Sequence, residues 1–80
     1  MKLKRSRRRG AGRLELLDAM MDSYLNWRTE SRAVAESYRT WRFAADSERG
    51  VAFDRYAAAL DREEDAAGGY RRVAERAHAA

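Results

Sequence analysis

Apolar and small residues recur at alternating intervals of three and four along this chain, from about residue 13 to its end. That spacing places them along one side of an α-helix, and it is the repeat found in coiled coils. A β-strand would instead require apolar residues at every second position, and no sustained alternation of that kind occurs. The pattern therefore predicts an all-α fold.

Two sets of such positions predict two long helices, over about residues 13–45 and 47–79. Between them, Asp46 or Ser47 is expected to cap the second helix through a side-chain oxygen, and Gly50 falls in its first turn. The first set is Leu17, Met20, Tyr24, Trp27, Ser31, Val34, Tyr38, Trp41 and Ala45, and the second is Phe53, Tyr56, Leu60, Glu63, Ala67, Tyr70, Ala74 and Ala77.

The two predicted helices have nearly equal lengths, so a turn at about residues 45–48 would lay them against each other in opposite directions. In this register Trp41 lies opposite Phe53 near the turn, and Leu17 lies opposite Ala77 at the far end. In every layer between these two, the same register places a residue of the first set opposite a residue of the second set. A ridge of small residues runs beside the second set and consists of Ala52, Ala59, Ala66 and Val73. We therefore expect an antiparallel two-helix hairpin.

Gly68 and Gly69 lie side by side within the second predicted helix. They flank Ala67, which the register places opposite Trp27, so they could leave room for the indole against a nearly bare backbone. Two glycines cost a helix about 2 kcal/mol relative to alanine, and burial of a tryptophan can offset that cost. The alternative is that the pair ends the helix as a C-cap, with residues 70–80 as a short third helix or tail. We favour the continuous helix.

One layer of the predicted hairpin is polar, with Ser31 opposite Glu63. A partly buried carboxylate needs a partner, and Arg28, Arg32 or Arg62 could reach this one. Polar layers of this kind fix the register of coiled-coil helices. We therefore expect Glu63 to have a structural role and not a catalytic one.

The chain has 80 residues, which is close to the size at which a single core gives only marginal stability. A two-helix hairpin buries one stripe of residues per helix, so apolar residues beside that stripe stay exposed to water unless another helix packs on them. The first helix carries such residues at the end far from the turn, namely Leu14, Leu16, Met21 and Leu25. A second hairpin packing there would form a four-helix bundle, so we predict a homodimer; docking onto a different protein is the alternative.

The start of the chain is strongly basic. Seven of the 17 Lys and Arg lie in residues 1–13 without any acid, whereas the rest of the chain carries 13 Asp and Glu against ten Lys and Arg. We expect residues 1–12 to be a flexible arm, hinged at Gly10 and Gly12, that contacts nucleic acid or an acidic partner, and residues 13–80 to be the hairpin. The contact residues would be Lys2, Lys4, Arg5, Arg7, Arg8, Arg9 and Arg13. Since the arm has no aromatic residue, stacking on single strands is not indicated.

Glu75 and His78 place a carboxylate and an imidazole three residues apart on one helical face. Ferritin-like di-iron proteins use this Glu-x-x-His spacing. The chain resembles the short ferritin-like hairpins in its predicted architecture and in this four-residue match. The resemblance implies a metal-binding hairpin completed by acids of the first helix, of which Glu15, Asp18 and Asp22 lie within reach. Two solvated side chains near a helix end are the other interpretation.

The sequence indicates no other chemistry. Without cysteine the chain can form neither a disulfide nor a thiolate metal site. It has no phosphate-binding glycine-rich loop and no serine or cysteine beside its histidine. The aromatic residues have the regular spacing of packed positions. We therefore expect no enzyme activity, no cofactor and no small-molecule substrate; the chain would be an interaction module or, alternatively, a small structural subunit of a larger complex.

The sequence also gives an expectation for location. It has no uninterrupted apolar run of the roughly 18 residues that would be needed to span a bilayer. Glu15, Asp18 and Asp22 interrupt the apolar segment that a signal peptide would need after the basic start. Leu3 is the arm's single apolar anchor for a membrane surface. We expect a cytoplasmic protein without membrane contact.

Overall fold

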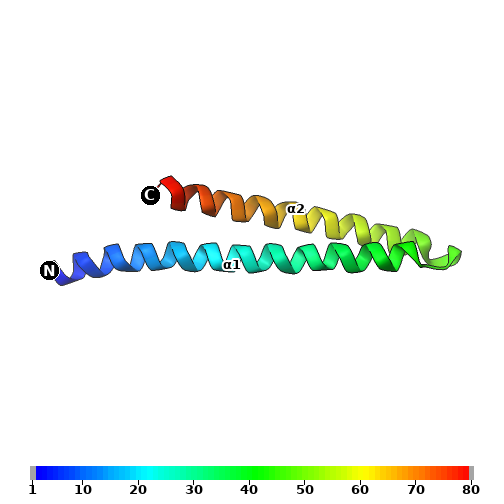
Figure 1. Cartoon of the computed structure of the whole chain (residues 1–80), viewed down its shortest axis with the longest axis horizontal. Coiled ribbons are helices and arrows are strands. Elements are labelled where there is room, and N and C mark those ends of the chain that lie inside the picture. The colour runs from blue at the N-terminus through cyan, green and yellow to red at the C-terminus, as the bar shows by residue number, and fades with distance from the viewer. Residues whose placement is uncertain (1, 80) are drawn as a thin grey trace.

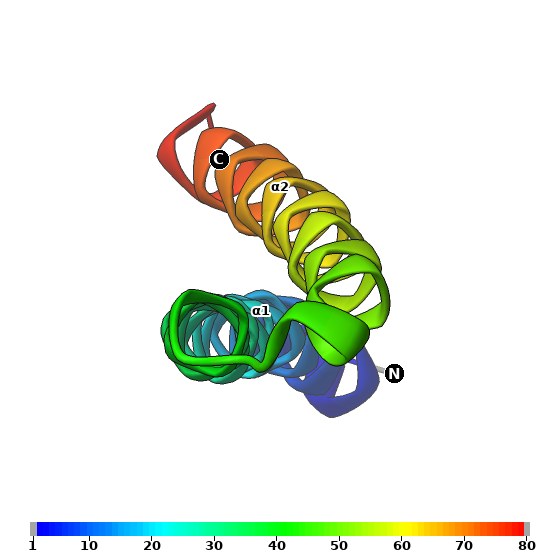
Figure 2. The same ribbon diagram turned by 90° about the vertical axis from the view of Figure 1, so that its right-hand side faces the viewer.

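The structure, a computed structural model, describes the backbone of residues 2–79 and the side chains of residues 12–79. It contains two long helices, α1 (Lys2–Arg42) and α2 (Arg49–Ala79), and a short 3-10 helix (Asp46–Glu48) between them. The long helices lie against each other in opposite directions in a rod of 67 × 18 × 13 Å (Figure 1). Figure 2 views the same rod from its turn end. The predicted all-α antiparallel hairpin is confirmed.

Backbone hydrogen bonds close the turn. α1 ends at Arg42, a little before the predicted end at residue 45, and Phe43 N–H still donates to the carbonyl oxygen of Arg39 at 3.1 Å. Glu48 N–H then donates to the carbonyl oxygen of Ala45 at 2.8 Å. This bond starts the 3-10 helix that leads into α2.

The predicted side-chain cap of the second helix is wrong. Ala45 is the N-cap residue of the 3-10 helix, with φ −65° and ψ 154°, and no side chain caps it. Asp46 and Ser47 lie within that 3-10 helix, and the N–H of Arg49 donates to the carbonyl oxygen of Asp46. Backbone carbonyl oxygens of the 3-10 turn thus accept the hydrogen bonds that a capping side chain was expected to accept. Gly50 falls in the first turn of α2, as predicted.

α1 begins at Lys2, well before the predicted start at residue 13. Its backbone passes through Gly10 and Gly12 without the expected break. Lysine and arginine are good helix formers and the segment has no proline, so it can be helical, although its glycines and its like charges at a helix N-terminus oppose the helix. The first turns of α1 extend past the end of α2 (Figure 1). The mobility of this arm stays a prediction.

α2 is unbroken at Gly68 and Gly69, so the C-cap alternative is wrong. The prediction that the glycines leave room for Trp27 is wrong as well. The nearest atom to a Cβ built at Gly68 is a guanidinium nitrogen of Arg72, at 3.4 Å, and at Gly69 the other such nitrogen lies at 3.9 Å. The glycines follow Ala67 by one and two positions, about 100° and 200° round the helix, so they point away from the indole.

The closest packing of the two helices follows the alanine ridge. Ala52, Ala59 and Ala66 are the buried residues among the described side chains, and Ala59 is only 1% exposed. The large residues of the two predicted sets are covered only in part. Alanine lets the helix backbones approach closely, so the line of contact lies on the ridge and not on the aromatic positions beside it.

α1 meets the ridge with small and polar residues. Partly buried residues at seven-residue intervals along α1 and the turn that follows it are Ser23, Glu30, Ser37 and Ala44. The hydroxyl of Ser23 donates to the carbonyl oxygen of Met20 at 3.1 Å, and that of Ser37 donates to the carbonyl oxygen of Val34 at 3.0 Å. Since each serine is satisfied by its own helix, the contact needs no polar partner from α2.

This packing gives the hairpin two unlike sides. One side carries partly exposed large residues from both helices, which we call the apolar face; it consists of Leu17, Tyr24, Tyr38, Phe53 and Leu60. The opposite side has a shallow groove lined mainly by polar residues of both helices, including Ser23, Asn26 and Asp65. There Arg62 Nε lies 3.1 Å from Glu30 Oε2 in a salt bridge.

Candidate interaction surface

Two clusters of aromatic rings lie along the apolar face. The first contains Tyr24, Trp27 and Tyr70, and the second contains Tyr38, Trp41 and Tyr56. In each cluster the indole stacks on the tyrosine of α2, with 9° between the ring planes and 5.8 or 5.6 Å between the centroids. The clusters are two heptads apart on both helices. The face is therefore built from a repeated unit.

The tyrosines of α1 complete each unit in the same way. Tyr24 meets Trp27 edge-on, at 6.1 Å and 68°, and Tyr38 meets Trp41 at 6.0 Å and 66°. The tyrosine pairs across the hairpin are tilted by 59° and 58°. Offset and edge-to-face contacts are the favoured geometries of aromatic pairs and contribute about 0.5–1.5 kcal/mol each beyond burial. The rings pack against one another as predicted, but they do not form the buried core, since Tyr24 and Tyr38 are 39% and 40% exposed.

The two units differ in the polar group that meets the indole. Trp27 Nε1–H donates to Glu63 Oε1 at 2.9 Å. At the equivalent place two heptads away lies Arg49, whose guanidinium carbon is 5.5 Å from the Trp41 ring centroid. Arg49 Nη1 also donates to the carbonyl oxygen of Trp41, at 3.4 Å. A carboxylate thus binds the edge of one indole, whereas a guanidinium covers the face of the other.

The polar layer of Ser31 and Glu63 is held differently from the prediction. Glu63 is bound by an indole and not by an arginine. Arg62 lies on the other side of the hairpin, in its salt bridge with Glu30. The bond between Trp27 and Glu63 was not predicted, because a tryptophan at a packed position was counted as an apolar residue. The N–H of a partly buried indole nevertheless needs a hydrogen-bond acceptor.

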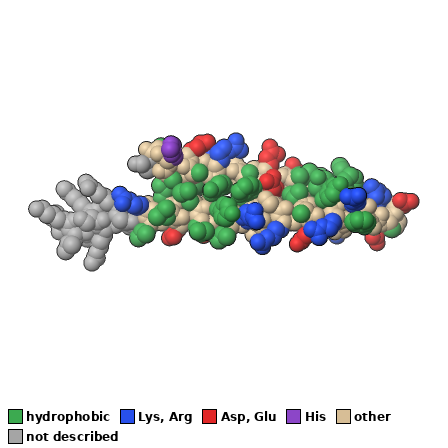
Figure 3. Space-filling view, viewed as in Figure 1, with side chains coloured by type: hydrophobic (Ala, Val, Ile, Leu, Met, Phe, Trp, Pro, Cys, Tyr) green, Lys and Arg blue, Asp and Glu red, His purple; other side chains and the backbone are tan. Residues whose placement is uncertain are grey.

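The predicted interface residues are mostly available to a partner. Leu14, Met21 and Leu25 are 62%, 58% and 53% exposed. Leu16 is partly buried, so it is a weaker candidate than predicted. A shallow hollow lined by Leu17, Met20, Met21, Tyr24 and Tyr70 joins this patch to the apolar face. Figure 3 shows the apolar side chains gathered along the line between the helices and over the outer side of α1.

A second apolar patch lies at the turn. Phe43 is 78% exposed, and Val51 is exposed beside it. The guanidinium of Arg42 lies over the Phe43 ring, 5.7 Å from its centroid. This patch was not predicted, because neither residue belongs to the regular spacing of the apolar positions. The sequence feature that could have indicated the patch is the position of these two apolar residues on either side of the predicted turn.

The structure places the basic arm as the first part of α1, beyond the end of α2 (Figure 1). Arg13 is exposed there. The side chains of the other predicted contact residues lie outside the described residues; they are Lys2, Lys4, Arg5, Arg7, Arg8 and Arg9. Their position at one end of the rod follows from the helix backbone alone.

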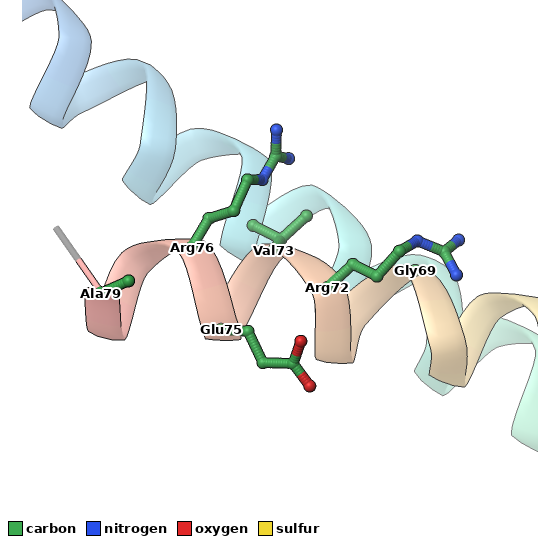
Figure 4. A pocket seen from close by; sticks show the side chains of 6 residues that line it. All are labelled: Gly69, Arg72, Val73, Glu75, Arg76 and Ala79. Atoms are coloured by element: carbon green, nitrogen blue, oxygen red, sulfur yellow. The ribbon is translucent and has the colours of Figure 1, made fainter.

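The structure does not assemble the alternative metal site. Glu75 and His78 are exposed, and within residues 12–79 no group of three or more His, Asp and Glu residues is close enough to hold a metal. In Figure 4 Glu75 extends to one side of α2, while Arg76, which lines the same shallow pocket, extends to the other. Glu15, Asp18 and Asp22 form no such group with them. The metal-binding alternative therefore gains no supporting observation.

Across the described length, neither helix has a stretch apolar enough to cross a bilayer. Comparison of the chain with protein-family models, with curated proteins and with solved structures finds no match.

Proposed function

We propose that the chain is a non-enzymatic self-association module whose hairpins pack in pairs, through their apolar faces, into a four-helix bundle. The observation that carries this proposal is the contrast between what the hairpin buries and what it exposes. The buried residues of the described part are three alanines, whereas large aromatic and aliphatic residues lie exposed along one side. A helix pair with this arrangement is half of a bundle.

The free energy of burying apolar surface favours a partner on that face. Burying a large apolar side chain contributes about 1.5–3 kcal/mol, and the hairpin alone gains little of this from Leu17, Phe53 or Leu60. A second copy would cover them on both chains at once. Leu14, Met21 and Leu25 would lie at the margin of the same contact. Self-association of this kind stabilises the fold by mass action.

The basic arm is the proposed contact with a partner of opposite charge, and nucleic acid is the partner we propose. Its Lys and Arg residues are dense enough to neutralise several phosphates, and the segment lies at one end of the rod, beyond the end of α2. Contact of this kind depends on phosphate charge and not on base sequence. An acidic protein partner is the other outcome that a binding experiment would distinguish.

Light scattering tests the self-association directly. We expect a solution mass twice the 9.2 kDa of one chain. Leu60→Glu places a carboxylate on the apolar face and should shift the mass toward that of the monomer. Val51→Glu is the matched control, because Val51 is also an exposed apolar residue of α2 but lies at the turn. A monomeric wild-type chain that remains helical would contradict the proposal.

The second candidate is a structural subunit of a larger complex. The exposed patch of Phe43 and Val51 favours it, since that patch lies at the turn, outside the face that a second copy would cover. A monomer in solution, with both the patch and the apolar face free, is the result that would support this candidate over self-association.

A further inference from the structure

Along the part of the rod nearer the turn, charged residues border the apolar face with one sign on each helix; toward the other end, Asp18 on α1 and Arg71 on α2 break this pattern. Arg32 and Arg39 on α1 directly follow Ser31 and Tyr38, so they lie about 100° further round the helix, on its outer edge. On α2, Asp54 and Asp61 follow Phe53 and Leu60 in the same way. Arg28 and Glu64 extend the two edges, and all six charged residues are exposed. Near the middle of the rod, Figure 3 shows basic side chains along α1 and acidic ones along α2.

These edges cannot neutralise each other within one hairpin. The arginines lie on the side of α1 that is remote from α2, and the acids lie on the side of α2 that is remote from α1. The salt bridge that forms among the described side chains, between Arg62 and Glu30, lies on the opposite side of the rod. The two edges are therefore available to a partner that approaches the apolar face.

A second copy can cover this face in two symmetric ways. If the two-fold axis runs along the rod, α1 of each copy packs on α2 of the other, and each basic edge meets an acidic edge. If the axis runs across the rod, α1 packs on α1 and α2 packs on α2, so edges of like charge lie together. Like charges held against each other disfavour an interface. The charge pattern therefore selects the axis along the rod.

The register supports the same choice. A two-fold axis along the rod does not move a residue along its length, so residues at equal height in one hairpin meet between copies. The contacts of Tyr38 with Tyr56 and of Trp41 with Phe53 set those heights. The opposite-charge pairs at equal height are Arg28 with Glu64, Arg32 with Asp61, and Arg39 with Asp54. Asp18 with Glu75, near the ends of the helices, is a like-charged pair at equal height.

We infer that the second copy packs parallel to the first about a two-fold axis along the rod, so that both turns lie at one end and both basic arms lie at the other. This inference rests on the proposed self-association and specifies its geometry. Two adjacent arms would offer twice the six Lys and Arg of residues 1–12 to a single polyanion. Binding of both arms to one molecule raises the apparent affinity through effective concentration.

Distance measurement between spin labels tests the orientation. The chain has no cysteine, so Ser47→Cys gives one labelling site per copy, at the turn. Turns at the same end should place the two labels within about 30 Å of each other, whereas turns at opposite ends would separate them by about 45 Å or more, from the 1.5 Å rise per residue of the helices. A dimer with the longer distance would overturn this inference and leave the proposed self-association intact. A monomer by light scattering would overturn both.

A charge-reversal cycle gives an independent test. Arg32→Asp and Asp61→Arg should each weaken the dimer by about threefold to tenfold, as expected for exposed charge pairs that occur twice per dimer. The double variant should recover most of that loss. Arg32 and Asp61 lie on opposite edges of one hairpin, so recovery has to come from contacts between copies. Arg55→Asp is the control, since Arg55 lines the pocket beside the turn, away from the apolar face. Losses that add without recovery would count against the axis along the rod.

Discussion

Trp27 donates its indole N–H to Oε1 of Glu63 at 2.9 Å, across the two helices of the hairpin. This bond explains how a carboxylate is accommodated among aromatic side chains. Both groups are partly buried, so each would lose a water partner on packing, and each supplies the other with a hydrogen bond. The polar layer of the hairpin is therefore an indole and carboxylate pair.

Replacement of Trp27 by phenylalanine should destabilise the hairpin more than the same replacement of Trp41. Both variants lose part of a stacked ring, and Trp41→Phe keeps an aromatic face for Arg49 to cover, but Trp27→Phe also leaves Glu63 without its donor. The extra cost should be about 1 kcal/mol, the net value of one partly buried hydrogen bond. Thermal unfolding followed by circular dichroism at 222 nm measures the difference. Equal losses in the two variants would show that the bond contributes no stability.

The hairpin and its register could be predicted from the sequence because both depend on helical geometry. Intervals of three and four fix one stripe per helix, and a single turn then fixes which residues meet. The contacts of Tyr24 with Tyr70, Tyr38 with Tyr56, and Trp41 with Phe53 confirm that register.

The line of closest contact within the stripe could not be predicted in the same way. The apolar stripe on α2 includes both Ala59 and Leu60, and periodicity alone ranks the larger residue as the better core candidate. The helix pair instead packs on Ala59, because small side chains allow the backbones to approach. The same rotation leaves the aromatic residues half covered and creates the apolar face. The partner of Glu63 was not predicted, because the pattern of apolar positions carries no information about the hydrogen bond that an indole N–H requires.

Ala59→Leu tests the importance of the ridge. Ala59 is the most buried of the three core alanines, so a larger side chain there should force the helices apart and destabilise the chain by about 1–3 kcal/mol. Ala58→Leu makes the same chemical change at the neighbouring exposed position and should alter stability little. Chemical denaturation of the two variants gives both values. If the two substitutions have the same effect, the ridge is not the packing surface.

Alanine at Gly68 or Gly69 should stabilise the chain. Neither glycine has a positive φ, and an added Cβ would meet only a flexible arginine side chain at van der Waals distance. Each substitution should therefore gain about 0.5–1 kcal/mol from the higher helix propensity of alanine. Melting temperatures of the two single variants and of the double variant measure the gain. A loss of stability at Gly68 would mean that another surface approaches the bare backbone there, which light scattering at several protein concentrations would reveal.

Removal of the arm should abolish nucleic-acid binding and leave the hairpin intact. Residues 2–12 extend past the end of α2, so their deletion shortens α1 without removing its packing against α2. Full-length protein should bind duplex DNA with a strong salt dependence, because each phosphate neutralised lowers the slope of log K against log salt by about 0.9.

A narrower change tests whether the charges of the arm act as a group. Replacement of Arg7, Arg8 and Arg9 by glutamine should make that salt slope shallower by about 2 to 3 units and weaken binding to all DNA sequences alike. The matched control is the same replacement at Arg71, Arg72 and Arg76, which removes equal charge from the exposed part of α2. If the control variant loses as much affinity as the arm variant, binding follows the total charge of the chain and the arm is not a distinct site. Tight binding to an acidic protein that DNA fails to displace would instead identify the partner as protein.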